Sequence, residues 1–354
     1  MKAMILKGYG GLEQFEMQEV PDPSPAEGEV LVRIRANGVC FHDILARQGH
    51  FPRTRTPGII GHEIAGEVAG LGRGVTEFKT GERVVVVMKD HCGHCRLCLK
   101  GHDNLCQNTG GLFGEEIPGG YAEYISVRAH ALVRIPDGVS FEQASVVPCA
   151  LGTAYHGLHA VGRVQPGEAV LITGATGGVG IHAVQVARML GARVIAVTTS
   201  AGKTDFLRDN GADDIIVSPE LDFADEARRI TGGNGVDVVF NIVGQLAWNA
   251  ALKSMGFAAR HVFVGNLNAA PVNLRPAHAI LKEMFFLGTE GVSRGEVETL
   301  LELVRLGRLR TVVGGTLPLA DACVRDALRL APAGLGRRLL EPLLHEAWAD
   351  ALRE

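Results

Sequence analysis

The stretch AVLITGATGGVGIHAVQVARML, residues 169–190, decides the fold because it predicts a strand, a glycine-rich turn and a helix in direct succession. Its first five residues suit a short buried strand, and the apolar residues after 180 recur with helical spacing. The small residues between them let the backbone approach a pyrophosphate, which the helix N-terminus attracts. Ala175 stands where the strict G-x-G-x-x-G pattern has its first glycine, but the strand–turn–helix context still indicates a dinucleotide site. The predicted cofactor-binding residues of this turn are Gly174, Ala175, Thr176, Gly177, Gly178, Val179 and Gly180.

Around this turn, apolar strands alternate with helical segments from residue 166 to about 290. Alternation of this kind predicts βαβ units, with about six parallel strands in a doubly wound Rossmann sheet. Residues 1–150 instead consist of short β-rich segments between Gly, Pro and Asp turns, which predicts a mostly β domain. We therefore expect an α/β protein with a dinucleotide-binding domain at 151–290. Residues 291–354 predict a helix, a short β segment and an amphipathic C-terminal helix at 342–352, and they suggest a return to the first domain.

The end of the second Rossmann strand bears on the choice of cofactor. Enzymes that use NAD place a carboxylate there to hold the ribose 2′-hydroxyl. Here the strand 193–198 is followed by Thr199, Ser200 and Lys203, with no carboxylate among residues 199–203. Hydroxyl and ammonium groups suit a 2′-phosphate better, so NADP(H) is favoured over NAD(H). The alternative is that Ser200 only caps a helix starting near Lys203.

The composition excludes several classes of protein. The 354 residues are 46% apolar and 21% charged, with a net charge of -4, which argues against disorder and against a nucleic-acid partner. No apolar run approaches the ~18 residues of a membrane helix, and the N-terminal apolar stretch is too short for a secretion signal. We expect a soluble, cytoplasmic protein without a membrane partner, in which the seven cysteines serve metal binding or catalysis rather than disulfides.

Four of the cysteines form a compact pattern, Cys92-x2-Cys95-x2-Cys98-x7-Cys106. Four thiolates in one loop match a closed tetrahedral zinc site, where the metal contributes directly to folding. The alternatives are an iron site with the same ligands, or an empty site with oxidised thiols. The histidines among these cysteines are expected to be solvated, because the four sulfur ligands already complete the site; they are His91, His94 and His102.

A second group is dispersed along the chain and consists of Cys40, His62 and Cys149. Two thiolates and one imidazole would leave a fourth position open for water or substrate, as in a catalytic zinc site. From spacing alone, the alternative that these are ordinary packing residues stays open.

The segment Gly61-His62-Glu63-Ile-Ala-Gly66-x5-Gly72-x2-Val75 resembles the signature of zinc-containing alcohol dehydrogenases of the medium-chain dehydrogenase/reductase superfamily. The four-cysteine loop, the segments 81–84 and 120–124, the stretch Cys149-x3-Thr153-x-Tyr155 and the glycine-rich turn follow in the family's order, so the resemblance covers residues 1 to about 340.

This resemblance implies a GroES-like catalytic domain at 1–150 that resumes near 290, and a homodimer or homotetramer. It implies that Cys40, His62 and Cys149 bind a catalytic zinc and that Glu63 can approach it. Asp43 would orient the ligand imidazole, and Thr153 would contribute to cofactor binding. The expected metal content is two zinc ions per chain.

One residue departs from the family's pattern. The second residue after the first zinc cysteine is usually Ser or Thr, whose hydroxyl bonds the substrate oxygen and starts a proton relay, whereas this sequence has His42. Leu45 stands where some members have a relay histidine. An imidazole could pass a proton, or it could face away and leave the relay to water.

The leading hypothesis is a zinc-dependent oxidoreductase that transfers a hydride between a nicotinamide cofactor, with NADPH favoured, and a small alcohol, aldehyde or ketone. The altered relay, together with the quinone-reductase-like segments GATGGVG and TTSAGK, suggests a second possibility, which is reduction of a conjugated C=C or an iminium bond. A hypothesis from another class is a non-catalytic scaffold that binds nucleotide without turnover.

Overall fold

The computed structural model of the chain describes residues 1–265 and 270–319, and the backbone of 337–341. The chain divides into two compact units. The first contains Met1–Cys149, Ser293–Arg305 and the described residues from Val313 on; the second contains Ala150–Val292 and Leu306–Val312. The tail helix predicted at 342–352 lies outside the described residues. No helix in the described part of the chain is long and apolar enough to cross a membrane.

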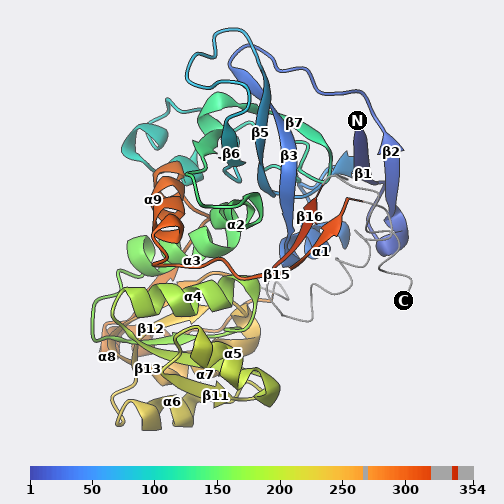
Figure 1. Cartoon of the computed structure of the whole chain (residues 1–354). Coiled ribbons are helices and arrows are strands. Elements are labelled where there is room, and N and C mark those ends of the chain that lie inside the picture. The colour runs from blue at the N-terminus through green and yellow to red at the C-terminus, as the bar shows by residue number, and fades with distance from the viewer. Residues whose placement is uncertain (266–269, 320–336, 342–354) are drawn as a thin grey trace. The chain divides into compact units, whose positions relative to one another are not determined.

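The first unit is built on a seven-stranded sheet in the order β15-β16-β3-β5-β6-β8, with β7 also paired to β3. Figure 1 shows the long blue strand β3 between β5 and the red strand β16. A second sheet has the order β2-β1-β4 and includes β1, the first strand of the chain. The strands of this unit are β1 (Lys2–Leu6), β2 (Phe15–Glu19), β3 (Glu29–Val39), β4 (Gly58–Ile59), β5 (Glu63–Leu71), β6 (Arg83–Val86), β7 (Tyr124–Arg128), β8 (Leu132–Arg134), β15 (Val313–Pro318) and β16 (Arg337–Glu341).

Local sequence explains these elements. Val30, Val32 and Ile34 alternate along β3 and are all buried, as expected of a strand with one face on a core. The helices of this unit begin at capping boxes. In each box, the side chain of the N-cap residue accepts a backbone N–H of the first turn, and a side chain of the first turn accepts the backbone N–H of the N-cap residue. They are α1 (Phe41–Arg47), α2 (Phe141–Ser145) and α9 (Arg294–Arg305).

The second unit contains the predicted Rossmann sheet. Its six strands are all parallel and lie in the order β11-β10-β9-β12-β13-β14. Every residue of β9, the strand of the opening stretch, is buried. The strands are β9 (Ala169–Ile172), β10 (Arg193–Thr198), β11 (Asp214–Val217), β12 (Val236–Asn241), β13 (Met255–Phe263) and β14 (Phe285–Gly288), and the helices are α3 (Gly152–Tyr155), α4 (Gly178–Met189), α5 (Thr204–Asp209), α6 (Ala224–Ile230), α7 (Trp248–Ser254) and α8 (Pro276–Lys282).

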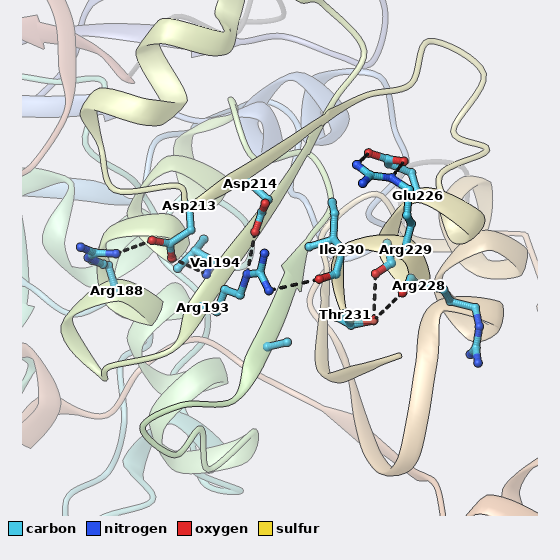
Figure 2. Close-up of polar contacts among 12 residues, drawn as sticks. Arg188, Arg193, Val194, Asp213, Asp214, Glu226, Arg228, Arg229, Ile230 and Thr231 are labelled. Atoms are coloured by element: carbon cyan, nitrogen blue, oxygen red, sulfur yellow. Dashed lines mark hydrogen bonds and ion pairs between the residues drawn. The ribbon is translucent and has the colours of Figure 1, made fainter. Parts of the chain in front are cut away.

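Two arginines form ion pairs with the carboxylates of Asp213 and Asp214, near the amino ends of β10 and β11. Figure 2 shows Arg193 reaching Asp214 at 2.8 Å, and Arg188 reaching Asp213 at 2.5 Å. Asp213 also accepts the backbone N–H of Val194 at 2.8 Å. Because parallel strands expose their ligand-binding edge at the carboxyl end, these arginines belong to the opposite edge. The residues that follow Thr198 lie at the carboxyl end of β10.

Candidate metal and cofactor sites

The four cysteines of the compact pattern meet in one cluster. Their sulfur atoms lie within 4.8 Å of one another, with Cys95 Sγ 3.5 Å from Cys98 Sγ and 3.9 Å from Cys106 Sγ. A tetrahedron with Zn–S bonds of about 2.3 Å has edges of about 3.8 Å, so the spacing fits a four-sulfur zinc site. The backbone N–H of Cys98, as the largest cause, lowers the pKa of the Cys95 thiol to about 6. The backbone thus favours the thiolate form of Cys95, whereas burial raises the pKa of the Cys98 thiol to about 12.

One neighbour of this cluster differs from the prediction. His91 is only 3% exposed, although it was expected to be solvated. Its ring packs against that of His130 with 4.8 Å between centroids, and this contact covers it. His91 is not part of the group of four sulfur ligands.

The dispersed residues also converge. Cys40, His62, Glu63 and Cys149 place one possible ligand atom each within 4.8 Å of one another, and all four are buried. The two sulfur atoms are 4.0 Å apart. This geometry favours a shared metal ion over four unrelated packing residues.

Three separate elements bring these side chains together. Cys40 is the N-cap of α1, Glu63 begins β5 directly after His62, and Cys149 lies in a π-helical turn at Val147–Leu151. A short π-helical segment is a frequent feature of functional sites. A Cβ atom at Gly38 would lie only 1.9 Å from Oε2 of Glu63. Glycine at 38 therefore makes the room that Glu63 needs.

Asp43 connects the parts of this site. Its Oδ1 lies 3.2 Å from His62 Nδ1, while Oδ2 accepts the Cys40 backbone N–H at 2.8 Å and the Tyr121 hydroxyl at 3.0 Å. Burial, followed by the charge of Asp43, raises the pKa of Tyr121, which keeps the hydroxyl protonated as a donor. With Nδ1 turned to the carboxylate, Nε2 of His62 is the nitrogen left for a metal.

The same carboxylate acts on the protonation of His62. Burial works to lower the pKa of the imidazole, but the charge of Asp43 and its hydrogen bond outweigh burial and raise that pKa well above its usual value. Since only a neutral imidazole can bind a metal through Nε2, a metal would compete with a proton for this ring.

The glycine-rich turn leads from β9 into the N-terminus of α4. Gly174 has a φ of +61°, a left-handed conformation that favours glycine. A Cβ at Gly180 would lie 2.1 Å from the carbonyl oxygen of Gly174, so only glycine fits there. Helix α3, which carries Thr153, contacts α4. The predicted cofactor residues of the turn and Thr153 therefore lie on neighbouring elements of one unit.

Thr199, Ser200 and Lys203 follow β10, next to this turn in the sheet order. Ser200 makes no side-chain capping hydrogen bond to the short 3-10 helix at Ala201–Lys203. The alternative in which Ser200 serves only as a helix cap is thus not seen. Ser200 is partly exposed.

The surroundings of His42 were not predicted from sequence. Its Nε2 lies 2.5 Å from Glu115 Oε1, and its ring stacks on Phe51 with 4.2 Å between centroids. Arg53 Nε lies 3.6 Å from the other oxygen of Glu115. No motif or regular spacing links these residues to the metal group, so nothing in the sequence pattern singles them out.

Comparison with known proteins agrees with both units. Residues 26–137 match the family described as alcohol dehydrogenase GroES-like domain, and residues 178–305 match the zinc-binding dehydrogenase family. The chain is 38% identical over 322 residues to an acryloyl-coenzyme A reductase of Metallosphaera sedula, covering 91% of this chain and 94% of that protein. It is 35% identical over 315 residues to an alcohol dehydrogenase of Geobacillus stearothermophilus, covering 88% and 91%.

Solved structures give the same result. The crystal structure of AibC superposes with a TM-score of 0.91 at 43% identity, covering 97% of this chain and 96% of that one. The fold class predicted from sequence, a GroES-like domain with a parallel Rossmann sheet, is confirmed. The scaffold hypothesis is set aside, because the relatives are oxidoreductases of a family that binds zinc and uses NAD or NADP. The chain therefore belongs to the zinc-containing alcohol dehydrogenase family of the medium-chain dehydrogenase/reductase superfamily, and it is an oxidoreductase.

Proposed function

We propose that this enzyme reduces a C=C bond conjugated to a carbonyl group, such as that of an unsaturated acyl thioester, with NADPH as the hydride donor. The observation that carries this choice is His42, which replaces the relay hydroxyl expected in an alcohol dehydrogenase and is held by Glu115. The likeness to an acryloyl-coenzyme A reductase over 91% of the chain supports it. In the balanced reaction, the hydride adds to the β-carbon, one proton adds to the α-carbon, and NADPH becomes NADP⁺.

A second candidate is the interconversion of a small alcohol with an aldehyde or ketone. The alcohol dehydrogenase of Geobacillus stearothermophilus, at 35% identity over 88% of the chain, favours it. Both reactions need a polarised substrate oxygen and a nicotinamide, and they differ in the carbon that takes the hydride. Reduction of an iminium bond, in which nitrogen takes the place of oxygen, is tested beside them.

We assign a structural zinc to Cys92, Cys95, Cys98 and Cys106 and a catalytic zinc to Cys40, His62 and Cys149. The close sulfur spacing and the soft, largely thiolate donor set support both assignments. A zinc ion bound at the second site would polarise a substrate oxygen, and the bound nicotinamide would supply or accept the hydride.

The chain's own residues act around that site. Asp43 turns His62 so that Nε2 faces the shared position of the ligand atoms, and the Tyr121 hydroxyl fixes Asp43 in turn. Glu63 lies within the same ligand group, so it can approach the metal when substrate or water leaves. Cys40, His62, Glu63 and Cys149 are all buried, which limits the water around the site and strengthens electrostatic interactions with a bound substrate.

For the cofactor, we propose that the turn 174–180 binds the pyrophosphate, with Thr153 nearby, and that Thr199, Ser200 and Lys203 bind the 2′-phosphate of NADP(H). Two observations support this: only glycine fits at position 180, and the Ser200 side chain makes no capping hydrogen bond to the helix that follows it. Lys203→Ala should lower kcat/KM for NADPH by roughly tenfold, as expected for a charged hydrogen bond to phosphate, and leave kcat/KM for NADH almost unchanged. A wild-type enzyme that prefers NADH would contradict the assignment.

Three broader proposals accompany the function. The domain boundaries are placed at 1–150 for the first part of the catalytic domain, 151–290 for the cofactor domain and 291–354 for the return. We propose a homodimer or homotetramer, supported by exposed apolar side chains near β14, among them Ile280 and Leu281 at 72% and 76% exposure. A cytoplasmic location is proposed because the six cysteines among the described residues are free thiols grouped as possible metal ligands.

A panel of conjugated acyl thioesters, enals, aldehydes, ketones and imines, each with NADPH, tests the function. Mass spectrometry of the products separates saturation of the C=C bond from formation of an alcohol or amine. The proposal requires that a conjugated acyl thioester gives the saturated thioester at one NADPH per molecule, with the highest kcat/KM of the panel. Preferred formation of an alcohol from an aldehyde or ketone would overturn it in favour of the second candidate.

A further inference from the structure

A buried carboxylate from a distant loop holds the imidazole of His42. Glu115 is 73 positions further along the chain, and its side chain is only 2% exposed. Its Oε1 lies 2.5 Å from His42 Nε2. Burying a carboxylate costs free energy unless another group compensates its charge. The close contact with His42 provides such a partner, so we infer a specific role for the pair.

The loop fixes Glu115 through its backbone as well. The carbonyl oxygen of Glu115 accepts the backbone N–H of Arg55 at 2.9 Å, and its own N–H donates to Leu112 at 3.2 Å. Arg53 Nε lies 3.6 Å from Oε2. Burial works to raise the pKa of Glu115, but the hydrogen bond from His42 and the charge of Arg53 act against burial, and the pKa is lowered. The ionised carboxylate can only accept, so the ring must donate through Nε2.

The plane of the ring is fixed too. His42 stacks on Phe51 with an interplanar angle of 17°, and it meets the edge of the His62 ring at 5.0 Å between centroids. His62 is one of the ligands proposed for the catalytic zinc. The side chain of His42 remains 34% exposed, so a ligand can reach the ring.

We propose that Glu115 is a positioning residue that holds His42 as the Nε2–H tautomer, so that Nδ1 accepts a hydrogen bond beside the proposed catalytic metal. This inference rests on the proposed function for its effect on turnover, because the group that bonds to Nδ1 is a bound substrate or a water molecule next to it. In this arrangement, the imidazole of His42 replaces the hydroxyl that the family usually has at this position. Glu115 itself does not touch the substrate.

The tautomer can be measured directly, without turnover. In zinc-loaded protein labelled with ¹⁵N-histidine, at a pH where the rings are neutral, the ring signals of His42 are assigned by their loss in His42→Gln. We expect protonated Nε2 and unprotonated Nδ1 in the wild type and in Glu115→Gln, whose amide oxygen can still accept. Glu115→Ala should give a mixture of tautomers. An Nδ1–H tautomer in the wild type, or unchanged signals in Glu115→Ala, would overturn the proposal.

Kinetics supply the second measurement. Glu115→Ala should lower kcat by roughly 10–100-fold, the scale of a misplaced catalytic contact, while zinc content and the KM for NADPH stay unchanged. Glu115→Gln should recover most of the loss. In a His42→Ala background, Glu115→Ala should cause no further loss, because a positioning residue acts only through the residue it positions. An undiminished further loss in that background would assign Glu115 a structural role instead.

Glu116→Ala is the matched control. Its carboxylate accepts the backbone N–H of Leu112 at 3.0 Å and supports the same loop without contacting His42. We expect its kcat to stay within a factor of about 3 of the wild type and the His42 tautomer to be unchanged; a loss equal to that of Glu115→Ala would refute the specific role. If no compound of the panel is turned over, the proposed function fails, while the tautomer measurement still decides this inference.

Discussion

At the scale of single residues, Gly180 is the clearest case of a position that tolerates one residue type. A Cβ there would lie 2.1 Å from the Gly174 carbonyl oxygen and 2.7 Å from Ala175 Cα, and both are backbone atoms of the turn. We expect Gly180→Ala to lower the free energy of unfolding by about 1–3 kcal/mol, as overpacking does, and to raise the KM for the nicotinamide cofactor. Urea denaturation and initial-rate kinetics measure the two effects.

Gly295→Ala provides the control for that change. Gly295 lies in α9 with no heavy atom within 4 Å of an added Cβ. Alanine at an exposed helix position should raise the free energy of unfolding by up to about 1 kcal/mol and leave the KM unchanged. Equal stability of the two variants would show that the turn adapts to a side chain, against our reading of Gly180.

His261 should make the stability depend on pH. It is fully buried in β13, and burial lowers its pKa to about 3. Below the unfolded-state pKa of about 6.5, the unfolded chain takes up a proton that the folded chain does not, so the free energy of unfolding falls by up to about 1.4 kcal/mol per pH unit from 6.5 toward 3. Above pH 6.5 this contribution is constant.

His261→Gln isolates that contribution. Glutamine can keep an acceptor for Asn241 Nδ2, which lies 3.2 Å from His261 Nε2, but it does not titrate. The difference in unfolding free energy between wild type and variant, measured by denaturation at several pH values, should shrink as the pH falls from 7 to 5. A difference independent of pH would mean that the pKa of His261 is the same in the folded and the unfolded chain.

At the scale of elements, the sequence predicts what depends on neighbouring residues. The strand β9, the turn and helix α4 follow from one continuous stretch, because burial, glycine conformations and helical spacing are local properties. The four-cysteine cluster is predicted for the same reason. The environment of His42 is not, because Glu115 reaches it from 73 positions away and no pattern records that contact. The prediction that Cys40 and Cys149 share one metal site came from the family resemblance rather than from their spacing in the sequence.

The four-cysteine loop and the dispersed ligand group should respond differently to loss of a ligand. Cys95 belongs to a short loop that has few regular elements of its own, so a metal bound there would contribute directly to its folding. Cys95→Ser should lower the melting temperature and the yield of folded protein. Cys149→Ser should instead abolish most activity with a smaller loss of stability. Each variant should lose one of two zinc ions per chain.

Calorimetry and elemental analysis of untagged protein test this pair of variants together. One zinc or none per wild-type chain would count against the assignment of two sites. If Cys149→Ser unfolded the protein while Cys95→Ser remained stable but inactive, the structural and catalytic roles would have to be exchanged.

At the scale of the whole molecule, the sequence predicts the presence of both units, because the β-rich and alternating textures differ along the chain. It does not name the substrate. The surroundings of His42 depend on side chains such as Glu115 and Phe51, which come from separate loops. The sequence does not predict the interface between copies either. Which apolar side chains are exposed to solvent is known only once the fold is known.

Assembly provides the last prediction. The strands β11 and β14 form the two edges of the described Rossmann sheet, and an open edge with exposed apolar residues is a template for pairing with another chain. Phe285 on β14 is 52% exposed, close in sequence to the exposed Ile280 and Leu281, whereas Val217 is the exposed apolar residue of the β11 edge. Phe285→Glu should therefore weaken assembly and, at micromolar concentration, shift light-scattering mass toward the 37.6 kDa of one chain. Val217→Glu, an equivalent charge on the opposite edge, should leave the mass of the wild-type oligomer unchanged. A monomeric wild type, or identical masses for the two variants, would remove the β14 edge as the interface between copies.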